Sequence, residues 1–319
     1  MNRIPVVYAL NAITAAFASS ESHESRVGGQ AIIEGVMMRS KENVSWAVQR
    51  PSGEVVVERH PFVSLSKKIT LLGKPVFRGV VSLIESLQLG FRALNRSAEL
   101  SVEEQHDETK KKSWKDGAAN ALSIGIALVI SFGLFLYLPL KILSFFVPQE
   151  SALVYNLLAG AIRMIFFLAY LVFISMLKDI RRVFEFHGAE HKAIFAFEDG
   201  KELTVDNMKP YTTFHPRCGT SFLLLVALIC VGIFAVIDGL LIHFVGPYPN
   251  TLIRTLVHIA FIPIVSGTSF EILRLTDKYR QIGVVRMFMQ PGLWLQRITT
   301  KQPDDSQLKI ASQALKAAL

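Results

Sequence analysis

Two histidines and a glutamate lie close together in the segment His187-Gly188-Ala189-Glu190-His191. On a helix, side chains four positions apart share one face and lie about 6 Å apart along the axis, so both imidazoles can reach one ion. The order His-x-x-Glu-His is that of the inverted zincin motif. The spacing predicts a metal site with His187 and His191 as ligands and Glu190 as catalytic base. A pair of core histidines bonded to neighbours is the alternative.

A second group of ligand types follows at His215-Pro216-Arg217-Cys218. His-x-x-Cys is a chelating turn in many zinc sites, so His215 and Cys218 are further candidate ligands. Nitrogen and sulfur donors make zinc the expected divalent ion. Arg217, at the start of the next expected helix, could instead bind a phosphate or carboxylate. Cys230 lies about 18 Å further along that helix, beyond disulfide range, so we expect a reduced Cys218.

The apolar content of the chain indicates its class. With 319 residues and a hydrophobic fraction of 51%, the chain is too apolar for an ordinary soluble protein. Four apolar runs account for this, at residues 118–147, 153–177, 222–245 and 252–275. Each is long enough to cross a hydrocarbon core of about 30 Å, which takes roughly 20 helical residues. We predict an α-helical integral membrane protein with four transmembrane helices. The first run contains Pro139 and Lys141, so we expect its membrane-embedded part to end before them.

Lysines and arginines indicate the orientation of these spans. The connections at 148–151 and 246–250 contain none, whereas the N-terminal region, the 178–217 segment and the C-terminal residues hold nearly all of them. Positive residues mark the cytoplasmic side. We therefore expect a multi-pass protein of the plasma (inner) membrane, with both termini and the histidine motif in the cytoplasm. Anionic lipid headgroups suffice as the partner of the net charge of +8, and no nucleic acid is expected.

The remaining segments are expected outside the bilayer. Residues 1–26 are expected to form a flexible arm, and residues 27–117 are expected to form a cytoplasmic α+β region with a charged linker. The spans lie in 118–177 and 222–275, and the metal-site loop and helix lie between them in 178–221. Residues 276–319 are expected to form a cytoplasmic tail. The α+β region predicts a small antiparallel sheet of about three strands, at 28–39, 44–49 and 54–59. An amphipathic helix at 80–98 has an apolar stripe for the membrane or the sheet, formed by Val80, Ile84, Leu87, Phe91, Leu94 and Ala98. Lys110-Lys111-Lys112 predicts a headgroup contact.

Several ionisable residues in apolar surroundings are further candidates. Glu34 is the carboxylate of an apolar stretch and could serve the site. Glu271, near the cytoplasmic end of the fourth run, could complete the metal shell. Arg163 and Asp238 lie inside apolar runs, where charge is costly. They predict structural ion pairs, Arg163 with Asp238 or Asp238 with Arg254, or alternatively a polar pathway.

Three long motifs resemble signatures of the YqhQ-like family of bacterial membrane proteins. They are Gly28-Gly29-Gln30-Ala31-Ile32-Ile33-Glu34-Gly35-Val36-Met37-Met38-Arg39, His187-Gly188-Ala189-Glu190-His191-Lys192 and His215-Pro216-Arg217-Cys218-Gly219-Thr220-Ser221-Phe222. The resemblance runs from about Val27 to the C-terminal residues. Members are commonly described as predicted metal-dependent enzymes of unknown function. The resemblance therefore implies a metal-dependent role but supplies no reaction.

Three classes of function fit these patterns. A zinc hydrolase would use Glu190 to deprotonate water for attack on a carbonyl of a membrane protein, peptide or lipid. A scaffold or assembly factor would close a structural site with His187, His191, His215 and Cys218. A transporter or lipid-handling protein would use Arg163, Asp238 and Arg217. We favour the hydrolase because a structural site has no need of a base beside the ion.

Overall fold

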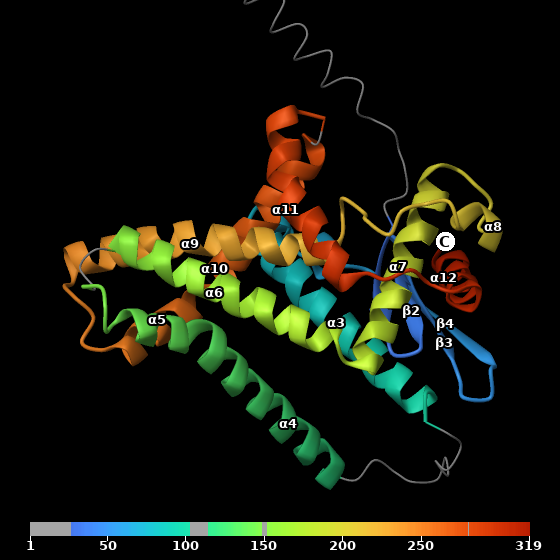
Figure 1. The fold of residues 1–319 in the computed structure, drawn as a ribbon, viewed down its shortest axis with the longest axis horizontal. Coiled ribbons are helices and arrows are strands. Elements are labelled where there is room, and N and C mark those ends of the chain that lie inside the picture. The colour runs from blue at the N-terminus through green and yellow to red at the C-terminus, as the bar shows by residue number, and fades with distance from the viewer. Residues whose placement is uncertain (1–26, 103–113, 149–151, 280) are drawn as a thin grey trace, which may run out of the picture.

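A computed structural model describes residues 27–102, 114–148, 152–279 and 281–319. Long apolar helices occupy one end of it, and a sheet covered by helices occupies the other (Figure 1). The elements are, in chain order, β1 (Gly28–Ile32), β2 (Gly35–Arg39), β3 (Asn43–Gln49), β4 (Val55–Pro61), α2 (Leu65–Lys68), η1 (Thr70–Gly73), α3 (Phe77–Leu100), α4 (Trp114–Phe132), η2 (Gly133–Tyr137), α5 (Leu138–Leu143), α6 (Ala152–Ser175), α7 (Lys178–Glu198), α8 (Val205–Met208), α9 (Gly219–Phe244), α10 (Thr251–Lys278), α11 (Gly283–Thr299) and α12 (Asp305–Ala318). The expected arm at 1–26 and the lysines at 110–112 lie outside the described residues.

Four helices are long and apolar enough to cross a membrane, as expected. They are Leu122–Leu143, Ala152–Ser175, Leu224–Phe244 and Thr251–Thr276. In the first three, at most 17% of the apolar window is buried inside the structure, so their apolar side chains face outward, as they would toward lipid. Insertion into a membrane and the orientation of the termini stay predictions.

The first of these helices continues through Pro139 and Lys141, past the point at which we expect its membrane-embedded part to end. Proline has no backbone N–H and cannot make the regular bond to the residue four positions back. The π-helical turn η2 directly precedes α5 and reroutes the backbone bonding at this point. The Lys141 ammonium lies 4.9 Å from the centroid of the Phe145 ring. The helical path therefore reaches Leu143 without a break.

The sheet has four antiparallel strands in the order β1-β2-β3-β4, so the expectation of three is wrong. The stretch expected as one strand at 28–39 reverses at Ile33-Glu34, and Ile32 pairs with Gly35 across that turn. Glu34 has φ 51°, a left-handed conformation that suits a tight turn. A Cβ on Gly35 would lie 3.0 Å from Cα of Val48, so this close strand pairing requires glycine.

Helices cover both faces of the sheet. One face packs against α3, through the residues Ile32, Met37, Val44, Trp46, Val48, Leu89, Ala93 and Leu100. The other face packs against α7 and α12, through a core that includes Val36, Met38, Ala47, Phe186, Ala189, Ala193, Leu308, Ala311 and Leu315. Met37 and Met38 thus belong to opposite cores, as expected for neighbours on a strand. The second core fixes α7 to the sheet.

The C-terminal residues expected as a tail form two helices, and the second belongs to the core. Helix α12 begins with a capping box in which Asp304 and Gln307 bond each other's backbone N–H groups. Ser45 on β3 donates a hydrogen bond of 2.5 Å to the carbonyl of Ala314. The tail interpretation is wrong because apolar residues recur at helical spacing here and the sheet needs a second covering helix.

Helix α3 confirms the expected amphipathic helix but packs on the sheet through a different face. Its buried residues include Val81, Glu85, Leu89, Ala93 and Ser97. The predicted stripe remains largely exposed, with Ile84 at 50%, Leu87 at 53% and Phe91 at 50%. Small residues on the buried face allow close approach to the sheet and to α10. The exposed stripe is therefore available to a membrane.

Candidate metal centre

Helix α7 spans Lys178–Glu198 and carries the histidine motif in the middle of the core. A Cβ on Gly188 would collide with the backbone carbonyl of Lys301, so glycine lets the chain after α11 lie directly against the helix. The amide of Lys301 donates to the carbonyl of Phe184 at 2.8 Å. Even Lys192 is buried, donating its ammonium to the Lys209 carbonyl at 2.7 Å. The motif is thus enclosed on most sides, more than one apolar stripe would predict.

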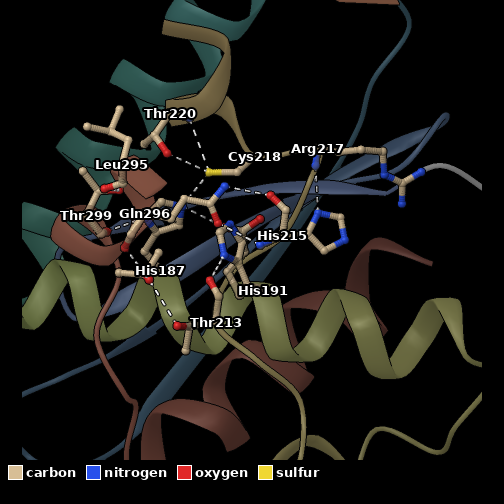
Figure 2. A network of polar contacts seen from close by, with 12 residues as sticks. His187, His191, Thr213, His215, Arg217, Cys218, Thr220, Leu295, Gln296 and Thr299 are labelled. Carbon is tan, nitrogen blue, oxygen red and sulfur yellow. Dashed lines mark hydrogen bonds and ion pairs between the residues drawn. The ribbon is translucent and has the colours of Figure 1, made fainter. Parts of the chain in front are cut away.

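Backbone carbonyls orient both histidines. Nδ1 of His187 lies 2.8 Å from the Thr299 carbonyl, and Nδ1 of His191 bonds the Thr213 carbonyl. A carbonyl oxygen only accepts, so each Nδ1 carries the proton and each Nε2 presents its lone pair. Figure 2 shows these contacts from two separate segments. Such bonds hold imidazoles in the orientation in which they ligate metals.

Cys218 completes a group of three ligand atoms. As expected, it lies at the start of a helix, as the N-cap of α9, and its sulfur accepts from the Thr220 amide at 3.4 Å. The sulfur is 3.2 Å from Nε2 of His187. Ligand atoms of His187, His191 and Cys218 all lie within 4.8 Å of one another. Both Cys218 and Cys230 are free cysteines.

The donor atoms fit a transition metal ion. Nε2 of His191 is buried and has no hydrogen-bond partner among the described residues. An unpartnered buried acceptor is costly, and a metal ion would take up its lone pair. Burial lowers the pKa of His191 and so favours the neutral form that ligates. Two imidazoles and a thiol are the donors that zinc sites use.

The carboxylate of Glu190 lies between the two imidazoles. One oxygen is 3.8 Å from Nε2 of His187 and 3.9 Å from Nε2 of His191. Burial raises the pKa of Glu190, while His187, His215 and a hydrogen bond from the Gly29 amide oppose the shift. A Cβ on Gly29 would lie 2.7 Å from Cγ of Glu190. The edge strand β1 therefore reaches the centre through a glycine.

His215 lies beside the three ligands and outside their group. Its ring is centred 5.7 Å from that of His191 and 4.4 Å from that of Phe195. Nδ1 accepts the backbone N–H of Arg217 at 3.3 Å, and Nε2 lies 3.5 Å from Glu198. The Gln296 side chain bonds both the backbone N–H and the carbonyl of His215, at 2.7 and 2.8 Å. Helix α11 thereby holds the returning loop in place.

Three other candidates form ion pairs away from the three ligands. Arg217 pairs with Glu198 at the end of α7. Glu34 pairs with Arg182 from the hairpin turn. Glu271 forms a two-pronged pair with Arg78 on α3, one bond being 2.6 Å. Neither carboxylate joins the group of three ligand atoms, because each is held by an arginine of another element.

The charged residues of the spans form a buried network around Asp238. Its carboxylate accepts bonds from Arg254 at 2.5 and 2.9 Å, and from Asn156 at 2.7 Å. His258 and Tyr248 bond the other oxygen at 2.9 and 2.8 Å. Asp238–Arg254, one of the two expected ion pairs, is therefore present. Arg163 does not join this network: its guanidinium makes no hydrogen bond with the described residues and lies 5.6 Å from the centroid of the Phe234 ring.

Sequence reasoning missed the residues that orient the ligands. Thr213 and Thr299 act through backbone carbonyls, which leave no trace in side-chain type. Gly29 acts from the edge strand β1, and Gln296 acts from α11, in a region that we expected to be a tail. The glycine pair at 28–29, directly before an apolar strand, was the available signal, since such glycines mark close backbone approach.

The fold and the site together define a helical protein with four membrane-length helices and a buried His/His/Cys group beside a small sheet. Residues 74–319 match the model of a family described as proteins of unknown function (DUF1385). The chain belongs to this family. It is 34% identical over 306 residues to the "Uncharacterized protein YqhQ" of Bacillus subtilis (strain 168), which covers 92% of each chain. No solved structure matches it.

Proposed function

We propose that the protein is a metal-dependent hydrolase whose site lies at the cytoplasmic face of the plasma membrane. The observation that carries the proposal is the position of Glu190. Its carboxylate oxygen lies 3.8 and 3.9 Å from the two imidazole nitrogens that face the ligand group. This carboxylate would be a base beside the bound ion, and it is held by the Gly29 amide and enclosed by protein.

The residues have separate roles in this proposal. His187, His191 and Cys218 would hold the ion, leaving one coordination position for water or substrate, as in catalytic sites. When bound, zinc supplies Lewis acidity and lowers the pKa of a neighbouring water molecule. Glu190 would take a proton from the attacking water and return it to the leaving group. The scissile carbonyl would be that of a peptide or ester.

The position of His215 favours this proposal over a closed structural site. A four-ligand site needs a ring nitrogen of His215 among the ligand atoms. The atoms that lie within 4.8 Å of one another come from His187, His191 and Cys218, and Nε2 of His215 lies 3.5 Å from Glu198. The Asp238–Arg254 pair similarly favours a structural role over a transport pathway. If the experiment below contradicts the hydrolase, the alternative that it supports is a scaffold with a structural metal site.

The test separates metal binding from turnover. Glu190→Gln keeps size and hydrogen bonding but removes the base, so about one metal ion per chain should remain while uncleaved membrane peptides or lipids accumulate in cells. Glu202→Gln, at an exposed position after α7, is the matched control. Cys218→Ser should release the ion. Two results together would contradict the hydrolase and indicate a scaffold. The Glu190→Gln strain would have the same peptides and lipids as the wild type, and the His215→Ala variant would lose its metal ion.

A further inference from the structure

A cavity of about 460 Å³ lies between the open end of the β1–β2 hairpin and the middle of α3. This volume is in the range of ligand pockets, roughly 300–1,000 Å³. Met37, Phe62 and Leu89 form apolar walls. Arg39, Lys41 and Lys67 bring cationic groups to the same cavity. None of the lining residues, all of which the structure describes, is acidic.

The carboxylate that faces Arg39 is already satisfied. Glu85 accepts from the Ser64 hydroxyl at 2.9 and 3.0 Å and from the Leu65 amide at 2.7 Å. Arg39 is 4.0 Å from that carboxylate, and its guanidinium is centred 4.1 Å over the Phe62 ring. Stacking holds the planar guanidinium in place, which reduces the entropy lost when it binds a phosphate. The cavity therefore has an excess of positive charge.

Helix α3 connects the cavity to a membrane-length helix. Arg78 pairs with Glu271 of α10, and a Cβ on Gly79 would lie 2.7 Å from the carbonyl of Gly267. Gly267 and Glu271 belong to the apolar helix Thr251–Thr276. Leu89, in the cavity wall, lies about 15 Å along α3 from this crossing. The cavity thus lies within reach of the surface at which that span would leave the bilayer.

The outer face of the same region is apolar. Ile84, Leu87 and Phe91 on α3 are about half exposed, as are Leu65 and Ile69 beside Lys67. Binding of a soluble phosphate compound would leave these apolar side chains exposed to water. A bilayer would cover them and would present phosphate groups at its surface. The combination of an apolar rim and a cationic cavity therefore favours a lipid over a free anion.

We propose that the cavity binds the phosphate group of an anionic phospholipid. Arg39, Lys41 and Lys67 contact the phosphate, and the glycerol and first acyl carbons lie on Met37, Phe62 and Leu89. Gly29 also lines the cavity, so the headgroup lies next to strand β1, whose Gly29 amide bonds the Glu190 side chain of α7. The binding site does not depend on hydrolysis, and its test does not use turnover.

The experiment measures lipid retention by the full-length protein in phosphatidylcholine nanodiscs containing traces of phosphatidylglycerol, by native mass spectrometry. Lys67→Gln combined with Arg39→Gln should weaken phosphatidylglycerol retention on the order of tenfold or more, as loss of charged hydrogen bonds predicts. Lys68→Gln, at the next residue and outside the cavity lining, is the matched control. Equal losses in the control would mean diffuse attraction and would overturn the proposal.

A second variant avoids the packing role of Arg39. Gly28 lines the cavity, and a Cβ there would meet nothing within 4 Å, so Gly28→Glu adds a carboxylate without a collision. It should abolish the preference for phosphatidylglycerol at an unchanged unfolding temperature, while Gly28→Ala keeps it. Inorganic phosphate and glycerol phosphate are added as competitors. Displacement of the lipid by either at millimolar concentration or below would show that the ligand is a soluble phosphate and overturn the lipid assignment.

Discussion

The Gly29 amide on β1 donates a hydrogen bond to the Glu190 carboxylate on α7, although 161 residues separate them in the chain. A Cβ on Gly29 would lie 2.8 Å from Oε1 and 2.9 Å from Cδ of Glu190. The contact joins the N-terminal sheet to the candidate metal centre. It also makes the orientation of the candidate base depend on a residue with no chemistry of its own.

Gly29→Ala tests this contact. The added methyl group should displace the Glu190 side chain and destabilise the fold by about 1–3 kcal/mol, as overpacking does. We expect the metal content to be kept and the Glu190-dependent function to be lost, because the three heavy atoms nearest to the added Cβ all belong to Glu190. Gly28→Ala, where a Cβ meets nothing within 4 Å, is the control and should be nearly silent in thermal unfolding. Equal behaviour of the two variants would contradict the assigned contact.

Gly188→Ala tests the backbone that orients His187. Its Cβ would push against the Lys301 carbonyl and move the segment whose Thr299 carbonyl holds Nδ1. Loss of such an orienting contact typically weakens metal affinity about 10–100-fold. Titration with a competing chelator measures this directly. Gly219→Ala, beside Cys218 but in open space, should leave the affinity unchanged; a chelator curve that matches wild type for Gly188→Ala as well would refute the role.

Asp238→Asn should be strongly destabilising. Arg254 is fully buried and relies on Asp238 as its charge partner. Breaking a buried pair by removing one partner costs about 3–5 kcal/mol. Thermal unfolding in detergent measures the loss, with Asp179→Asn, in the first turn of α7, as control. If Asp238→Asn unfolds like the wild type yet loses function, the network belongs to a polar pathway instead.

Helix α12 provides a test of the corrected C-terminus. Ala311 is fully buried between the sheet and α7, so Ala311→Asp places an unpaired charge in the core and should abolish folding of the sheet region. Lys309→Asp changes charge at an exposed position of the same helix and should change stability by about 0.5 kcal/mol or less. Limited proteolysis distinguishes the two. Equal protease resistance of the two variants would contradict the placement of α12 in the core.

The orientation in the membrane follows from the placement of Lys and Arg and can be measured by cysteine labelling. Lys201→Cys should react only after the membrane is permeabilised, and Pro249→Cys should react in intact cells, because the first lies in the cationic segment and the second in a connection without cations. Both positions are exposed in the structure. The reverse pattern would place the candidate metal centre outside the cytoplasm and make a reduced Cys218 difficult to explain.

Features with local causes were predictable from the sequence alone. Apolar run length specified the four membrane-length helices, and the spacing of His187 and His191 placed both imidazoles on one face of α7. Cys218 at the start of α9 was predictable from the apolar run that follows it. These properties depend on residues within a few turns of each other, so side-chain pattern suffices.

Only the tertiary structure decided which polar groups meet. Glu271 was expected to complete the metal shell and Glu34 was a further candidate for the site, but Arg78, 193 residues from Glu271, and Arg182, 148 residues from Glu34, hold them elsewhere. The entry of α12 into the core likewise depends on partners far along the chain. Pairing of this kind is set by how the helices and the sheet pack, because charges and backbone carbonyls interact over a few ångströms in space with no sequence periodicity of their own.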